Sequence, residues 1–169
     1  PALRAPFKDD DMHKVHPFLW FDGQAHEAAE LYCSLFRNSK ILSVVRYPPG
    51  SPGGMEGKVM TVEFELDGLR YSALNGGPNF KFTEAVSFVI DCEDQAEVDH
   101  YWNGLIADGG APSQCAWLKD RFGLSWQVVP KALPRLMSDP DPAKAQRVVQ
   151  AMLKMSKIIV ADLEAAHAG

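Results

Sequence analysis

The sequence predicts an α+β fold in which a strand–helix–strand unit occurs twice and a helical segment follows. The clearest sign is the segment 59–66, where apolar and polar residues alternate up to an Asp-Gly turn, as in a β-hairpin. Two amphipathic helical patterns, in 24–36 and 94–107, align without a gap at an offset of 70 residues. A proline-rich break at 139–142 then separates the second unit from one more amphipathic pattern.

Composition narrows the class of protein. A chain of 169 residues with 46% hydrophobic content suits one soluble domain, or two small halves that share a core. The net charge of -5 and the lack of a Lys/Arg cluster argue against a nucleic-acid partner. Three cysteines without a C-x-x-C pair favour a reducing, cytoplasmic setting. No apolar run reaches the roughly 18 residues that a membrane span needs.

The chain begins with a segment that shows no periodicity. Residues 1–13 are predicted to be a flexible leader or an expression remnant, and they are left out of the fold prediction.

The first unit opens with an apolar strand at 16–21, which Asp-Gly ends. The spacing of the apolar residues in 24–36 predicts a helix, and 41–47 predicts a second strand. The proline- and glycine-rich loop 48–54 is not expected to form regular structure.

The hairpin that follows has a predicted register. Pairing outward from the Asp67-Gly68 turn brings an opposite-charge pair and an aromatic pair opposite each other. The expected pairs are Leu66 with Leu69, Glu65 with Arg70, Phe64 with Tyr71, and Met60 with Asn75.

The second unit repeats this order. An apolar strand at 85–91 precedes the helix at 94–107, for which Asp94 and Glu97 form a capping box, and two or three short strands follow in 113–129. The two helices match when Glu27 is set against Glu97. Either the unit is duplicated, which the shared order of elements favours, or two amphipathic helices align by chance.

The tail lies outside the repeat. Asp141 and Pro142 predict the start of a helix that runs to about residue 155, and residues 158–166 can add a further turn or two. Such a helix is expected to pack on the domain or against a second subunit.

Three ordered blocks resemble a known family: PFLWFDGQAHEAAELYCSLF, NGGPNFKFTEAVSFVIDCEDQAEVDHYW and GLSWQVVP. They are similar to the PhnB-like family, also labelled 3-demethylubiquinone-9 3-methyltransferase, of the vicinal oxygen chelate (glyoxalase/bleomycin resistance/dioxygenase) superfamily. The resemblance covers residues 14–165. It implies two βαβββ modules, 14–79 and 80–130, that form a curved mixed sheet around a cavity, a C-terminal helical extension at 131–169, and a homodimer.

Enzymes of that superfamily usually hold a divalent metal through His and Glu side chains. The resemblance places Gln127 at the position of the last-strand Glu, after the D-x-x-G turn 120–123, and places Asn75 and Ser87 near two further ligand positions. His16 lies near a fourth, with a register that is ambiguous by one residue. Because neutral amide oxygens bind transition metals weakly, we expect neither a tight metal site nor another cofactor.

Each candidate ligand-binding residue could instead have a purely structural role. Gln127 shares a strand face with Ser125 and either lines the cavity or pairs with backbone at a sheet edge or loop. Asn75 is a cavity amide or a turn residue. Trp20 is a core aromatic or part of a stacking wall for a ligand.

Three functions follow from these expectations. The first is a metal-poor or metal-independent enzyme that polarises a small molecule of unknown identity through Gln127, Asn75 and Ser87. The second is a non-enzymatic protein that sequesters a small molecule, of the bleomycin-resistance type. The third is the methyltransferase that the family label names, although the glycine clusters here do not open a helix as a doubly wound methyl-donor or dinucleotide site requires.

Overall fold

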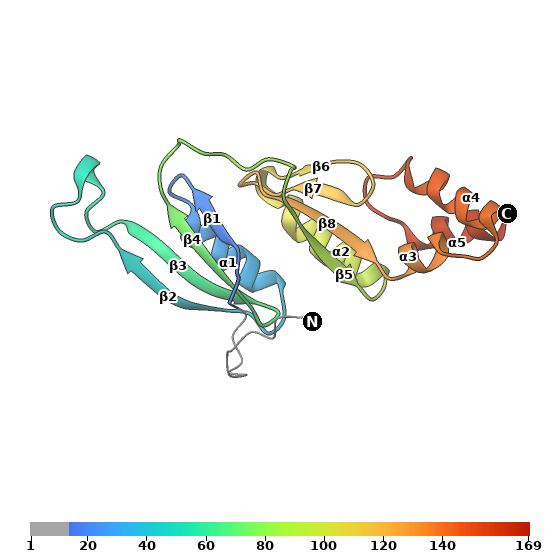
Figure 1. The fold of residues 1–169 in the computed structure, drawn as a ribbon, viewed down its shortest axis with the longest axis horizontal. Coiled ribbons are helices and arrows are strands. Elements are labelled where there is room, and N and C mark those ends of the chain that lie inside the picture. Colours follow the sequence, from blue (N-terminus) through green and yellow to red (C-terminus); the bar gives the residue numbers. More distant parts are fainter. Residues whose placement is uncertain (1–13) are drawn as a thin grey trace, which may run out of the picture. The chain divides into compact units, whose positions relative to one another are not determined.

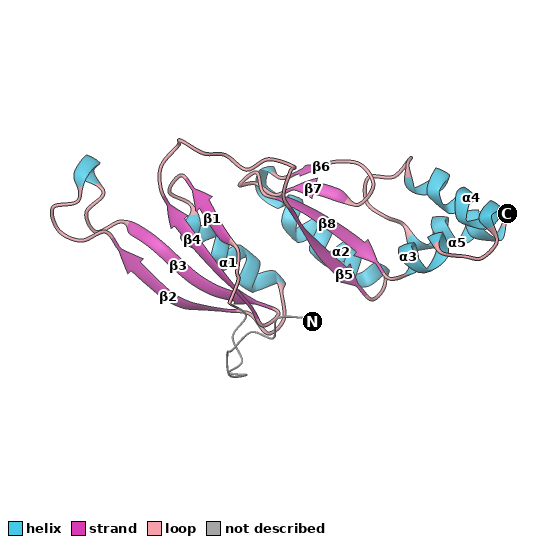
Figure 2. Ribbon diagram, viewed as in Figure 1, coloured by secondary structure: helices cyan, strands magenta, loops and turns pink. Residues whose placement is uncertain are grey.

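The structure is a computed structural model that describes residues 14–169 and confirms the predicted α+β class (Figure 1). Residues 14–169 divide into two compact units, one of residues 14–19 with Ala25–Gly76, the other of Trp20–Gln24 with Gly77–Gly169. These described residues form two four-stranded sheets, each packed against a helix (Figure 2). The predicted leader, 1–13, lies outside the described residues.

The first sheet has the strand order β1-β4-β3-β2. Its module consists of β1 (Phe18–Phe21), α1 (Ala25–Leu35), β2 (Lys40–Arg46), β3 (Val59–Leu66) and β4 (Leu69–Asn75). Helix α1 packs on β3 and buries Ala25, Ala28, Ala29 and Tyr32. Ala28 and Tyr32 belong to the apolar stripe that the sequence spacing predicts, while its other two members, Leu31 and Leu35, are only half-buried. The loop after β2 is irregular apart from one 3-10 turn, Pro52–Gly54.

The β3–β4 hairpin has the predicted register. Leu66 pairs with Leu69, Glu65 with Arg70, and Phe64 with Tyr71. Asp67 and Gly68 both have positive φ, 48° and 79°, which is the backbone of a type I′ turn and explains the Asp-Gly pair. The register places Val62, Phe64, Leu66, Tyr71 and Ala73 on one buried face.

The second sheet has the equivalent order, β5-β8-β7-β6. Its module consists of β5 (Ser87–Cys92), α2 (Gln95–Ile106), β6 (Ala111–Pro112), β7 (Trp117–Lys119) and β8 (Ser125–Pro130). β5 runs parallel to β8, and β7 runs antiparallel to β8. The predicted cap is present, because the Asp94 side chain accepts a hydrogen bond from the Glu97 N–H at 3.0 Å.

The two modules match element for element. Helix α1 begins at Ala25 and α2 at Gln95, which is the predicted offset of 70 residues, and the two sheets share one strand order. This agreement supports duplication over chance alignment. The division of the chain at residues 13, 79 and 130, and the cavity that the curved sheet is expected to surround, remain predictions.

The tail differs from its prediction in three places. A helix that the sequence did not predict, α3 (Ala132–Met137), follows β8 directly. Helix α4 (Pro142–Met152) ends earlier than the expected residue 155, and residues 158–166, expected to add a further turn or two, lie largely in a separate helix, α5 (Val160–Ala168). The reason for the break is that the carbonyls of Met155 and Ser156 accept hydrogen bonds from Cys115 and Ala116, so the chain leaves the helical path there.

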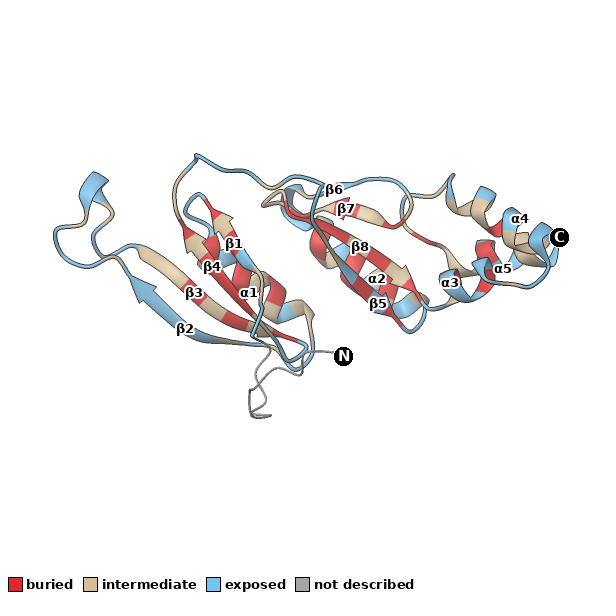
Figure 3. Ribbon diagram, in the orientation of Figure 1, coloured by how far each residue is buried: buried red, intermediate tan, exposed pale blue. Residues whose placement is uncertain are grey.

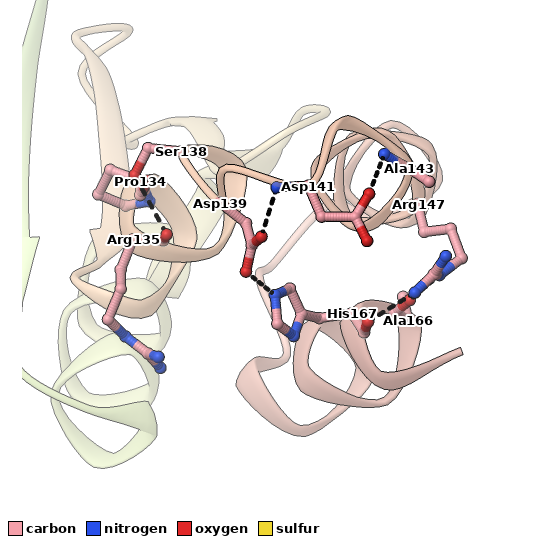
Figure 4. A network of polar contacts seen from close by, with 9 residues as sticks. All are labelled: Pro134, Arg135, Ser138, Asp139, Asp141, Ala143, Arg147, Ala166 and His167. Atoms are coloured by element: carbon pink, nitrogen blue, oxygen red, sulfur yellow. Dashed lines mark hydrogen bonds and ion pairs between the residues drawn. The ribbon is translucent and has the colours of Figure 1, made fainter.

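The tail has a core of its own. Its buried side chains belong to Leu133, Leu136, Val148, Ile158 and Leu163, which pack with Ala116 (Figure 3). Polar contacts close the end of this bundle, as Figure 4 shows. His167 pairs with Asp139 at 2.8 Å, and the Arg147 guanidinium donates to the carbonyls of Ala166 and His167.

Within residues 14–169, no helix is both long enough and apolar enough to cross a membrane.

Candidate functional site

Strand β8 presents Gln127 on the face of the second sheet that lies opposite helix α2. Trp126 and Val128 are buried on the helix side, at 2% and 0% exposure. Side chains alternate along a strand, so Ser125, Gln127 and Val129 point to the other side. We call this side the open face of the second sheet, and it is the face on which the sequence placed the candidate cavity residues.

The turn before β8 fixes the register of this strand. One carboxylate oxygen of Asp120 accepts hydrogen bonds from the N–H groups of Phe122 and Leu124, and the other accepts from the Trp126 indole at 2.9 Å. Gly123 has a φ of 88°, which favours glycine at this position. The sequence identified the D-x-x-G turn but not this role of its aspartate, whose partners emerge only in the fold.

Strand pairing arranges the open face in rows. In one row, Ser125 of β8 pairs with Ser87 and Lys119 on the two neighbouring strands. In the next row, Gln127 pairs with Val89 and Trp117. The Gln127 amide donates from Nε2 to the Ser87 hydroxyl at 2.9 Å. The fold therefore brings together three of the predicted residues, Ser87, Ser125 and Gln127.

Ser125 has an unusual environment. Its side chain is 1% exposed, and its Oγ has no hydrogen-bond partner among the described residues. A hydroxyl that is buried without a partner costs about 1–3 kcal/mol relative to a paired one. Ser125 is thus the polar group on this face that most needs an external partner.

A small pocket, which we call the polar pocket, contains Ser125. It has a volume of about 230 Å³ and is lined by Ser125, Lys119, Glu84, Trp117, Leu118, Ser113, Ala111 and Pro112. At about 30 Å³ per water molecule, it holds the volume of about eight waters. It therefore suits a small molecule or one end of a larger one.

An ion pair between Lys119 and Glu84 flanks the polar pocket. The Lys119 hydrogen bond, together with a backbone hydrogen bond, lowers the pKa of Glu84, so its carboxylate stays ionised near neutral pH. Both side chains are well exposed, so the pair adds little stability and a ligand can open it at low cost.

A second hollow, which we call the aromatic pocket, shares Lys119 with the polar pocket. It has a volume of about 280 Å³, and five of its lining residues are aromatic: Trp20, Phe21, Phe80, Phe82 and Phe122. Among the sequence candidates, only Trp20 belongs to it. The alternating aromatics of Asn79-Phe-Lys-Phe82 were the signal that a sequence-based search for the site could have used.

Asn75 makes backbone hydrogen bonds that the sequence did not indicate. It is 3% exposed, its Oδ1 accepts from the Ala25 N–H at 2.9 Å, and its Nδ2 donates to the Val59 carbonyl at 3.1 Å. The side chain therefore caps the start of α1 and ties it to β3. With its amide engaged by the backbone, we do not include Asn75 in the proposed site.

His16 belongs to the first unit, and its contacts lie within that unit. Its Nε2 lies 3.1 Å from the Ser72 hydroxyl, which is 4% exposed. The neighbouring Arg70 pairs with Glu63 at 2.7 Å, although its cross-strand partner by register is Glu65. Both contacts join residues of the first unit.

Known proteins are similar to this chain over most of its length. The family model described as 3-demethylubiquinone-9 3-methyltransferase matches residues 13–129. The PhnB protein of Bacillus cereus, given the same description, is 35% identical, with 70% of this chain and 99% of that chain covered and a TM-score of 0.64. The chain belongs to this PhnB-like family.

A more distant relative agrees on the fold. The PA1353 protein of Pseudomonas aeruginosa is 20% identical, with 70% of this chain and 97% of that chain covered and a TM-score of 0.59. No curated protein matches the chain. The family match ends at residue 129, so helices α3 to α5 of this PhnB-like protein lie beyond it.

The superfamily's divalent metal does not fit the residues of this PhnB-like chain. Gln127 and Asn75 offer neutral amides, and each already donates a hydrogen bond within the protein. In the described residues, no group of three or more His, Cys, Asp or Glu side chains is placed to hold a metal ion. Neutral amide oxygens in these roles favour hydrogen bonding over metal coordination.

The family description does not correspond to a methyl-donor site of the doubly wound kind. In residues 14–169 the links from β1 to α1 and from β5 to α2 span 22–24 and 93–94. Neither is the glycine-rich turn that such a site places between a strand and a helix.

Proposed function

We propose that this PhnB-like protein binds a small polar molecule in the polar pocket, without a resident metal ion. The observation that carries the proposal is the Ser125 hydroxyl, which is buried and unpartnered in the described residues and belongs to a residue that lines the pocket. A ligand that hydrogen-bonds to this hydroxyl removes the cost of burying it without a partner, and this contributes favourably to the free energy of binding. A pocket whose polar groups already have partners does not offer this contribution.

The charges of the pocket define the ligand further. Ser125 both donates and accepts hydrogen bonds, and Lys119 supplies a positive charge once Glu84 is displaced. Gln127 lies on the same strand face as Ser125 and donates from Nε2 to Ser87, but it is not among the residues that line the polar pocket. A compact molecule with a hydroxyl beside a carboxylate, or beside an amide, matches this set of groups.

The titratable groups favour capture over turnover. Glu84 is held ionised, and burial raises the pKa of the Cys92 thiol to about 12. A general base works best with a pKa near the operating pH, and a nucleophilic thiol needs a lowered pKa. We therefore favour the sequestering role, of the bleomycin-resistance type, over the enzyme hypothesis.

The cysteines support a reducing compartment for this function. Cys33, Cys92 and Cys115 are all free thiols. Proteins of oxidising compartments usually pair their cysteines, so we propose a cytoplasmic setting.

The proposal is tested by NMR titration of the full chain with glycolate and with glycolamide. We expect saturable shifts of the β5, β7 and β8 amides and of the Trp117 indole. Ser125→Ala should weaken binding by about 2- to 10-fold, the change in affinity expected from the loss of one hydrogen bond. Ser43→Ala, at an exposed serine of β2, is the matched control and should bind as the parent does.

Two results would contradict the proposal. One is that neither probe produces saturable shifts at these strands. The other is that Ser125→Ala and Ser43→Ala bind a probe equally well.

A further inference from the structure

We propose that the aromatic pocket holds a planar ring of the same ligand, which makes the ligand a small aromatic acid or a close relative of one. This inference rests on the proposed function, because it extends the polar pocket into its neighbour. Lys119 lines both pockets. A molecule that occupies both therefore has its polar group beside this ammonium.

The walls of the aromatic pocket are arranged for a flat ring. Trp20 and Phe80 meet edge to face, with centroids 4.9 Å apart and planes at 82°. Phe21 meets Phe82 at 5.2 Å and Phe122 at 6.0 Å, with planes at 75° and 85°. Edge-to-face pairs are a favoured aromatic geometry, and a ligand ring can join them by the same contacts.

One wall of the pocket is fixed before a ligand arrives. The Trp20 indole donates from Nε1 to the Gly77 carbonyl at 2.8 Å, which sets the orientation of its ring. A wall held in this way needs little ordering when a ligand binds, and affinity gains from such preorganisation.

Phe80 shows that this wall is incomplete. Its side chain is 65% exposed although its ring packs edge to face on Trp20. A single exposed apolar residue needs no explanation, but this one lines an aromatic pocket. A ligand ring in the pocket would cover part of the Phe80 side chain, and the burial of that apolar surface would contribute favourably to the free energy of binding.

The charged residues at the aromatic pocket indicate the sign of the charge that the ligand carries. Lys81 and Lys119 line it together with one carboxylate, Asp22, and Lys119 contributes its charge once Glu84 releases it. Arg121 lies near by, with its guanidinium carbon 4.9 Å from the centre of the Phe122 ring. An aromatic cage can also hold a quaternary ammonium, but two lysines in the wall oppose a cation and favour a carboxylate.

Three probes of matched size test the inference by calorimetry and by Trp fluorescence. Benzoate carries both the ring and the charge, benzamide lacks the charge, and cyclohexanecarboxylate lacks the planar ring. We expect benzoate to bind at least about 5-fold more tightly than either of the others. Only benzoate can place a planar ring in the aromatic pocket and a negative charge beside Lys119.

Variants separate the two pockets. Phe80→Ala should weaken benzoate binding about 10-fold and leave glycolate binding unchanged, since glycolate has no ring. Lys119→Gln should weaken the binding of both. Phe18→Ala removes a phenylalanine of similar exposure, 59%, that does not line the pocket, and it should change neither.

The possible failures are distinct. If Phe80→Ala binds benzoate as the parent does, or if cyclohexanecarboxylate matches benzoate, the aromatic assignment is wrong, while Ser125-dependent glycolate binding would leave the proposed function intact. If tetramethylammonium binds more tightly than benzoate, the assigned charge is wrong. If glycolate binding does not depend on Ser125, the proposed function fails whatever benzoate does.

Discussion

The Ser125 hydroxyl contributes unfavourably to stability and favourably to the proposed binding. Because it is buried without a partner in the described residues, Ser125→Ala should leave the free energy of unfolding unchanged or raise it by up to about 1 kcal/mol. Urea denaturation of the ligand-free protein measures this. A gain in stability joined to a loss of glycolate binding is typical of a binding residue and not of a core residue.

Ser72 provides the comparison for Ser125. It is buried to a similar degree, at 4% exposure, but its hydroxyl lies 3.1 Å from the His16 ring. Ser72→Ala should therefore destabilise the protein by about 1 kcal/mol or more. If Ser125→Ala costs as much as Ser72→Ala, the Ser125 hydroxyl has an internal partner, and the central observation of the proposed function is lost.

Asn75 should prove important for stability. Asn75→Ala removes the acceptor for the Ala25 N–H and the donor to the Val59 carbonyl, so we expect a loss of about 2–3 kcal/mol in the free energy of unfolding. Circular dichroism in urea measures the loss. Asn79→Ala, at an exposed position of the following loop, should change stability by less than about 0.5 kcal/mol. Equal effects of the two substitutions would show that the cap contributes nothing.

At the residue scale, the sequence predicted which side chains share a strand face but not which partners they find. Ser125 and Gln127 lie on the open face because alternation along a strand is a local rule. The cap by Asn75, the three bonds of Asp120 and the pairing of Arg70 with Glu63 depend on tertiary contacts. Such contacts leave no periodic signal in one sequence.

At the scale of elements, the hairpin was set by local sequence, whereas the tail was set by tertiary contacts. The β3–β4 register follows from a two-residue turn and alternating residues, all within 17 positions, and it was predicted correctly. The end of α4 depends on backbone bonds from Cys115 and Ala116, about forty residues earlier in the chain. Local spacing cannot signal a helix end that a distant loop imposes.

The contact between α5 and the turn before α4 should depend on pH. A hydrogen bond from the Asp141 N–H and then one from His167 lower the pKa of Asp139 below its ordinary value of 3.8 (Figure 4). A carboxyl whose pKa is lower in the folded state stabilises that state above the unfolded pKa, and this contribution is lost as pH falls through the folded pKa. Asp139→Asn should therefore lower the melting temperature at pH 6 and have a much smaller effect at pH 3.

Melting curves of the parent and of Asp139→Asn at both pH values test this prediction. Asp91→Asn replaces an exposed aspartate of β5 and serves as the control, with no such difference expected between pH 6 and pH 3. A deficit of Asp139→Asn that is equally large at the two pH values would contradict an ionised Asp139 as the cause.

For the whole molecule, metal content tests whether this chain differs from the metal enzymes of the superfamily that it resembles. Amides at the matching positions and the Gln127–Ser87 hydrogen bond favour neutral ligands, so protein purified without a chelator should contain well under one metal ion per chain. Elemental analysis measures this directly. Stoichiometric zinc, nickel or iron would overturn the interpretation of Gln127 as a hydrogen-bonding residue.

The assembly state is the remaining prediction for the whole molecule, and its physical basis is the edge of the first sheet. β2 is the terminal strand of that sheet, and it exposes Leu42, Val44 and Val45 at 42%, 38% and 46%. An exposed apolar edge strand is prone to pair with another chain, and natural proteins usually protect such an edge with charges or cover it. We therefore expect light scattering to give twice the mass of one chain.

A charge placed on this edge tests whether it is the part that is covered. Val44→Lys should shift the mass toward the monomer, because a buried ammonium opposes association. Leu69→Lys replaces an apolar residue of similar exposure, 48%, at the hairpin turn, and should leave the dimer intact. A parent protein with the mass of a single chain would defeat the prediction of a homodimer, and a Val44→Lys variant that stays dimeric would place the interface away from β2.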